Sequence, residues 1–143
     1  MGLKISFTVH GTPKPQGSKR AYVNKKTGQP VITESAGIPL KDWRTDVQQS
    51  AITAMNGVPP LEGPIFVSLR FQLARPKSHP KTKQTWPATR PDIDKLARAV
   101  LDALTHICFV DDGQVVSLTV HKTWGPPGVA VYIADARVGR WAI

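Results

Sequence analysis

The sequence predicts an α+β fold, a two-layer single domain in which a mixed β-sheet carries two main helices on one face. The chain has 143 residues, which is the length of one domain. Several short segments alternate between apolar and polar residues, as strands do, and two longer segments repeat apolar residues at helical spacing. Strands with only two helices between them favour helices that cover one face of a sheet. We therefore expect residues 1–143 to form one domain.

The predicted strands are short and are separated by turn residues. The alternation predicts strands at residues 3–9, 64–74, 116–121 and 128–136, and a hairpin at 22–33. The short segment Gly125–Gly128, rich in glycine and proline, joins the last two strands. We therefore expect these two strands to be adjacent and antiparallel.

Two segments have the period of an amphipathic helix. The first carries its apolar residues at Leu40, Trp43, Val47, Ala51 and Met55. Asn56-Gly57 is a good signal for its end. The second carries Leu96, Val100, Leu104 and Ile107, and is expected to make about three to four turns. Pro91 and Asp92 have the character of its start.

Basic residues dominate the charge of the protein. There are 19 Lys and Arg against 10 Asp and Glu, for a formal net charge of +9. Such an excess indicates a polyanionic partner such as nucleic acid. A single cysteine, Cys108, excludes an internal disulfide and fits a reducing compartment. Because no apolar run approaches membrane-spanning length and no signal peptide is evident, we expect a cytoplasmic location and no membrane partner.

Half of the acidic residues gather in the segment Arg90–Val116. They are Asp92, Asp94, Asp102, Asp111 and Asp112. Asp92 and Asp94 are two positions apart, so they can converge on one ion only if Asp92 lies at or before the helix cap. Asp111-Asp112-Gly113 is a predicted turn. An acidic turn beside an acidic helix start can supply carboxylate oxygens from two elements, which is the ligand type that Mg²⁺ prefers.

Each aspartate also has an ordinary structural interpretation. Asp92 fits an N-cap, Asp94 fits a first-turn acid, and Asp111 and Asp112 fit a turn. Any one of them alone is better explained in that way, whereas the four together in a basic chain favour a metal site. Asp102 follows Arg98 by four residues, so we expect a surface ion pair and leave it out of the catalytic set.

Three blocks of this segment carry a resemblance to a known family. They read RPDIDKL from Arg90, LDAL from Leu101 and DDGQVV from Asp111. The pattern resembles the RusA-type Holliday junction resolvases, the crossover junction endodeoxyribonucleases. These usually read Pro-Asp-x-Asp-Asn-Leu-x-Lys, then Leu-Asp-Ala-Leu, then Asp-Asp-x-Gln-Val. The resemblance implies a small homodimeric endonuclease of DNA recombination and repair, encoded by a bacterial host or a phage, that uses Mg²⁺ to cut four-way DNA junctions. Mn²⁺ would substitute for Mg²⁺.

The resemblance also implies which residues act. Asp92, Asp94 and Asp112 would be catalytic and hold one or two Mg²⁺ ions, with Asp111 beside them as an orienting or additional ligand. The family's lysine falls on Arg98 and its asparagine on Lys95, so both departures keep or add positive charge. Either cation would stabilise the transition state, and the choice between them stays open because a guanidinium and an ammonium are not interchangeable.

Two basic loops supply candidate DNA contacts. The predicted contacts are Lys14, Lys19 and Arg20 in a loop at 10–20, and Arg75, Lys77, Lys81, Lys83 and Arg90 in a loop at about 75–91. The second loop has neither the helical nor the strand periodicity of apolar residues, so we predict a long, mobile segment that leads into the acidic site. Simple solvation is the alternative for the first loop. Trp86 either stacks on an unpaired base or holds the second loop to the domain.

Two other functions fit the composition. The first is a non-catalytic basic DNA-binding protein. Its function would explain the positive net charge, and the aspartates of the acidic segment would have only structural roles. A metal nuclease acting on other branched DNA would use the same aspartates. The products formed from branched DNA would separate the three functions.

Overall fold

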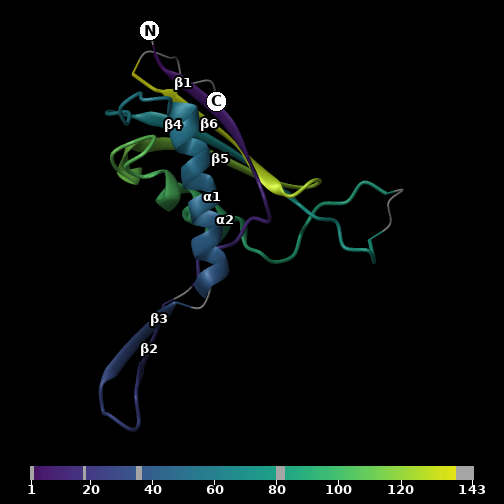
Figure 1. Ribbon diagram of the computed structural model, residues 1–143. Helices are drawn as coiled ribbons and strands as arrows, with labels where there is room; N and C mark the ends of the chain where they lie inside the picture. The colour runs from purple at the N-terminus through teal and green to yellow at the C-terminus, as the bar shows by residue number, and fades with distance from the viewer. Residues whose placement is uncertain (1, 18, 35–36, 80–82, 138–143) are drawn as a thin grey trace.

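A four-stranded mixed sheet forms one layer of the domain and two helices form the other (Figure 1). The computed structural model describes residues 2–17, 19–34, 37–79 and 83–137. The elements of this sheet and its helices are β1 (Lys4–His10), α1 (Gly37–Met55), β4 (Ile65–Leu73), α2 (Ile93–Leu104), β5 (Val115–Trp124) and β6 (Gly128–Asp135). The helices contact each other, α1 contacts β1, and α2 contacts β5. The predicted fold class is therefore confirmed.

The sheet has the order β1-β6-β4-β5 and buries one face against the helices. In β4 the alternate residues from Ile65 to Leu73 are buried, as predicted for 64–74. β6 supplies Val129, Val131 and Ile133 to the same core. Burying an aliphatic side chain of this size contributes about 1.5–3 kcal/mol, so this alternation fixes which face of each strand meets the helices.

The expected pairing of the last two strands is wrong. β6 lies between β1 and β4 and is antiparallel to both, whereas β5 pairs with β4 in parallel. The connection between β5 and β6 crosses the end of β4, where the Gly125 N–H donates to the Leu73 carbonyl (3.0 Å). Burial explains the order: β6 is apolar enough for the centre, whereas Val116 and Leu118 of the edge strand β5 are nearly half exposed.

Both helices begin close to the predicted positions, but α2 ends at Leu104, so the prediction that Ile107 belongs to this helix is wrong. The five predicted core residues of α1, from Leu40 to Met55, are all buried. Asn56 and Gly57 follow with φ of 47° and 82°, the left-handed conformation that closes many helices. α2 has 12 residues and buries one stripe that includes Leu96, Val100 and Leu104. No helix in the described part of the chain has the length and apolar character to cross a membrane.

Two basic segments project from this layered body (Figure 1). β2 (Lys19–Val23) and β3 (Pro30–Glu34) pair as the predicted hairpin, in a separate two-stranded sheet. The second segment connects β4 to α2 and contains no helix or strand in its described residues. Figure 1 shows the hairpin extending past the start of α1 and the second segment extending sideways from the sheet and helices, so both are available to a large partner.

The end of β6 is held by a local ion pair. The Asp135 carboxylate accepts hydrogen bonds from the Arg137 backbone N–H (2.9 Å), Nε (3.1 Å) and Nη2 (2.8 Å). These bonds lower the pKa of Asp135 from its usual value of 3.8 to about 2. The charged form of Asp135 is therefore favoured by folding.

This pair predicts part of the acid sensitivity of the fold. A carboxylate whose pKa is lower in the folded state stabilises the protein above the unfolded pKa, and the contribution is lost as the pH falls through the folded pKa. The window here runs from about 3.8 down to about 2. Asp135→Asn should lose less stability than the wild type between those pH values, as measured by thermal unfolding at stepwise pH. Asp42→Asn, at an exposed position of α1, is the control and should follow the wild type. Parallel curves for Asp135→Asn and the wild type would contradict the assignment.

Candidate functional site

The start of α2 presents two aspartates to solvent. Asp92 is the N-cap residue, with extended backbone (φ −70°, ψ 136°), and its carbonyl accepts the Leu96 N–H (3.0 Å). Its carboxylate makes no capping hydrogen bond. Asp94 lies in the first turn and is exposed. The condition for Asp92 and Asp94 to approach one ion, that Asp92 lies at the cap, is therefore met.

Asp92 has one neighbouring cation. Lys95 Nζ lies 3.7 Å from its carboxylate, and the two side chains are 41% and 51% exposed. An exposed pair of this kind contributes about 0–1 kcal/mol. Asp92 can therefore exchange Lys95 for another cation at small cost.

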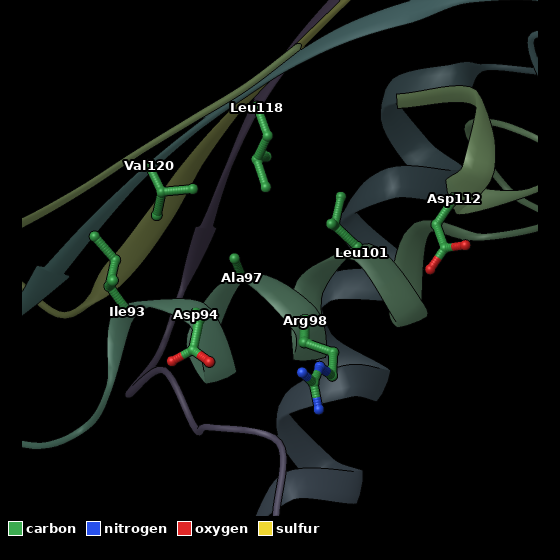
Figure 2. Close-up of a pocket in the computed structure, with 8 residues that line it drawn as sticks. All are labelled: Ile93, Asp94, Ala97, Arg98, Leu101, Asp112, Leu118 and Val120. Atoms are coloured by element: carbon green, nitrogen blue, oxygen red, sulfur yellow. The ribbon is translucent and has the colours of Figure 1, made fainter. Parts of the chain in front are cut away.

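A cleft of about 430 Å³ lies between α2 and β5. Its apolar wall consists of Ile93, Ala97, Leu101, Leu118 and Val120. Figure 2 shows that Asp94, Arg98 and Asp112 occupy the outer side, with Arg98 between the two aspartates. Arg98 makes no ion pair within the described residues. The cleft thus offers two carboxylates and an uncommitted guanidinium.

Asp112 is positioned by the turn that follows α2. It begins a short 3₁₀ helix, η1 (Asp112–Gln114). The Gln114 side-chain amide donates to the carbonyls of Leu61 (2.9 Å) and Gly63 (2.8 Å). Its oxygen accepts the N–H groups of Val110 and Asp111. One side chain therefore holds the acidic turn to the segment before β4.

The electrostatic surroundings of Asp112 disfavour its charge. Partial loss of hydration is the main cause that raises the pKa of Asp112, and a hydrogen bond and charge repulsion from Asp111 add to it. The charge of Asp102 acts in the same direction, whereas the Gly113 N–H lowers the pKa. Clustered carboxylates of this kind gain stability when a cation binds.

The predicted metal ligands share a region without forming a closed cage. Within the described residues, no three His, Cys, Asp or Glu side chains gather closely enough to hold a metal ion. Asp92 and Asp94 lie at the start of α2, whereas Asp112 lies toward the other end, beside Leu101 (Figure 2). The structure therefore brings Asp94, Arg98 and Asp112 to one cleft and leaves Asp92 next to it at the cap.

The expected pairing of Asp102 with Arg98 is wrong. Asp102 instead accepts a hydrogen bond from Arg44 Nη2 of α1 (3.4 Å). The same Arg44 Nη2 donates to Gln16 Oε1 in the first basic loop. Because α1 packs against α2, Arg44 is close enough to link three segments, a tertiary contact that helical spacing cannot reveal.

The first basic loop lies against the start of α2. The Gln16 N–H donates to the Lys95 carbonyl (2.9 Å), and Lys14 nearby in the sequence is half-buried. Lys19 and Arg20 follow in β2, but their side chains lie outside the described residues. The loop is thus a neighbour of the acidic site.

The second basic loop is attached to the domain at its described ends. Arg75 donates to the Lys83 carbonyl (3.4 Å), and Trp124 Nε1 of β5 donates to the Thr85 hydroxyl (3.0 Å). His79 meets the Trp124 ring edge to face. Three predicted DNA contacts of this loop are exposed: Lys77, Lys83 and Arg90. Lys81 lies outside the described residues.

Trp86 does not perform the holding role considered for it. Its side chain is 64% exposed, whereas Trp124 makes the contacts that attach the loop. The exposed ring of Trp86 remains available to a partner. The stacking role therefore stays a prediction.

Three residues with clear structural roles near the site were not predicted from the sequence. They are Gln114, Arg44 and Lys122, the last of which donates to the carbonyls of Thr89 and Pro91. Gln114 could have been predicted from the local sequence, because a Gln three residues after the N-cap residue Asp111 fits a capping box. The other two act between segments that are distant in the sequence.

Comparison with known proteins agrees with this arrangement. The family described as Endodeoxyribonuclease RusA matches residues 12–134, which include the basic residues of both loops, α2 and the acidic turn. The chain is also similar to the uncharacterized protein YqaN of Bacillus subtilis (strain 168). The two are 31% identical over 143 aligned residues, covering 92% of this chain and 96% of that protein. The chain therefore belongs to the RusA family of endodeoxyribonucleases.

Proposed function

We propose that the protein is a Mg²⁺-dependent endodeoxyribonuclease that resolves four-way DNA junctions by paired, symmetric nicks. The observation that carries the proposal is the cleft between α2 and β5, which has Asp94, Arg98 and Asp112 along its outer side. In a chain with a net charge of +9, acidic residues beside a free guanidinium suit a site where a cation and a phosphate meet. Membership of the RusA family supports nuclease chemistry.

The donor set fits a hard divalent cation. Asp92, Asp94 and Asp112 are exposed. Loss of hydration is the main cause that raises the pKa of Asp112, and a positive ion would relieve the charge repulsion from Asp111 and Asp102 that adds to it. Mg²⁺ commonly takes one or two carboxylates and completes its shell with waters and substrate phosphates, so a closed protein cage is not needed. Asp92 and Asp94 would hold one Mg²⁺ ion at the start of α2, and Asp112 would hold a second ion from η1, with Asp111 orienting Asp112. When bound, the metal would offset phosphodiester charge and acidify a water molecule.

Arg98 is the cation best placed to act on the phosphate. Arg98 lines the cleft on the side of α2 that carries Asp94 and has no ion-pair partner in the described part of the chain, whereas Lys95 is paired with Asp92. The planar fork of Arg98 matches two phosphate oxygens and would stabilise the charge that develops in the transition state. Lys95 would be released toward the DNA backbone once a metal occupies Asp92.

The basic loops would hold the DNA on both sides of this cleft. Exposed Lys77, Lys83 and Arg90 would bind backbone phosphates, with Lys14 on the other side of the start of α2. The exposed ring of Trp86 would stack on an unpaired base at the junction centre. Because the loop ends are attached, these contacts would have a defined position relative to the acidic residues.

Cutting a junction symmetrically requires two sites. One chain supplies one such cleft, and two-fold pairing of identical chains would set two clefts in equivalent positions. We therefore propose a homodimer as the active form. DNA in the bacterial cytoplasm, of host or phage, would be its substrate.

Metal binding can be tested without any cleavage assay. A ligand that binds only the folded state stabilises it, by about 2.7 kcal/mol at 100 times its Kd, so Mg²⁺ should raise the thermal midpoint of the wild type. Asp94→Asn and Asp112→Asn should lose most of this shift, and Asp42→Asn should keep it. Because the pKa of Asp112 is raised, protons should compete with Mg²⁺ at a higher pH than at an ordinary aspartate, and the shift should shrink as the pH falls. A full Mg²⁺ shift in Asp94→Asn would remove that residue from the site.

Cleavage of a mobile four-way junction tests the activity. With Mg²⁺ the wild type should make paired nicks in strands of like polarity, and EDTA should abolish them. Asp92→Asn and Asp94→Asn should bind the junction normally but cut at least about 100-fold more slowly, since losing a ligand costs more than losing a group that supports one. Binding without nicks in the wild type would favour a non-catalytic DNA-binding protein. Preferential nicking of flaps would favour a nuclease for other branched DNA.

A further inference from the structure

Lys122 of β5 connects the sheet to the start of the acidic helix. Its Nζ donates to the carbonyl of Thr89 (2.9 Å) and to the carbonyl of Pro91 (2.9 Å). Both carbonyls belong to the few residues that lead into Asp92. Lys122 lies outside the three sequence blocks that resemble the RusA family, and it is partly buried.

Lys122 belongs to the row of β5 side chains that faces α2. Leu118 and Val120 line the cleft, and alternate residues of a strand point to the same side. Lys122 continues this row and reaches the end of the segment before α2. The same face of β5 therefore forms one wall of the cleft and holds the chain that enters it.

The two bonds constrain the backbone of Asp92 in particular. The Pro91 carbonyl is part of the peptide group that joins Pro91 to Asp92, so holding its oxygen orients that peptide plane. The Asp92 side chain makes no capping bond that would fix the residue independently. Hydrogen bonds from a charged donor are stronger than neutral ones, and partial burial of Lys122 reduces competition from water. Lys122 is therefore placed to influence the orientation of Asp92 through the Pro91 carbonyl.

We propose that Lys122 is a positioning residue that sets the Asp92 carboxylate for metal binding, an inference that rests on the proposed function. Two of the three ammonium hydrogens are committed to main-chain carbonyls, so Lys122 acts through the backbone. Its loss would loosen the first turn of α2 and weaken Mg²⁺ binding. The distant end of α2, where the Thr105 N–H donates to the Leu101 carbonyl, would be unaffected.

The test compares Lys122→Met, Lys122→Arg and the matched control Lys4→Met, which removes the same charge from β1. Amide exchange at Leu96 reports directly on the Asp92 carbonyl, and exchange at Thr105 serves as the internal reference. Lys122→Met should speed exchange at Leu96 roughly five- to tenfold, the effect of losing about one hydrogen bond. It should also raise the Mg²⁺ concentration for half-maximal cleavage about tenfold or more, as supporting groups of metal ligands do. Lys122→Arg should restore much of the slow exchange at Leu96 and much of the low Mg²⁺ requirement. Lys4→Met should match the wild type in both measurements.

Three results would overturn the proposal. Unchanged exchange at Leu96 with an unchanged Mg²⁺ requirement would show that Lys122 does not position Asp92. A lower cleavage rate at saturating Mg²⁺ with unchanged exchange would mean that Lys122 acts on the substrate itself. Faster exchange at Thr105 and Leu96 alike, with a lower thermal midpoint, would assign it an ordinary stabilising role. If the wild type cuts no DNA, the exchange data and the Mg²⁺-induced thermal shift still decide the positioning role separately.

Discussion

Parallel pairing of β4 with β5 is the constraint on which the site depends. Two parallel neighbours cannot be joined by a tight turn, so the chain must return across the sheet before β5 begins. α2 makes this return, and its direction is therefore opposite to that of both strands. As a result the start of α2 lies near the C-terminal part of β5, where Lys122 donates to the Pro91 carbonyl, and the acidic turn that follows α2 leads directly into the beginning of β5. One topological requirement thus places acidic groups at both ends of a single cleft.

The site concentrates negative charge in a protein that is otherwise basic. Half of the protein's carboxylates are concentrated around α2, and within the described residues two of them are in ion pairs: Asp92 with Lys95, and Asp102 with Arg44. Asp111 and Asp112 repel each other across the turn that Gln114 holds together. The fold therefore holds Asp111 and Asp112 in an arrangement that disfavours the charge of Asp112, and a bound cation would relieve this repulsion.

Local sequence patterns predicted most of the helices and strands, because the spacing of apolar residues within a segment indicates its secondary structure. The alternation in β4 and the apolar stripe of α2 identified both elements, and the preference of Asp for the helix cap predicted the position of Asp92. Apart from the end of α2, the predictions that were wrong concerned which elements lie next to each other. The insertion of β6 between β1 and β4, and the choice of Arg44 as the partner of Asp102, depend on which segments meet in space. Lys122 could not be found from the sequence for the same reason, since its partners are main-chain carbonyls with no side-chain signature.

The attachment of the second basic loop to β5 affects which parts of this protein can change in length during evolution. Trp124 and Lys122 hold its final part to β5, so the acidic helix is insulated from changes farther out along the loop. Doubling the length of a flexible connection costs only about 0.6 kcal/mol in closure entropy. Insertions and deletions in the outer part can therefore accumulate among relatives with small effects on the folded core, which allows the reach over a nucleic acid to evolve independently of the chemistry.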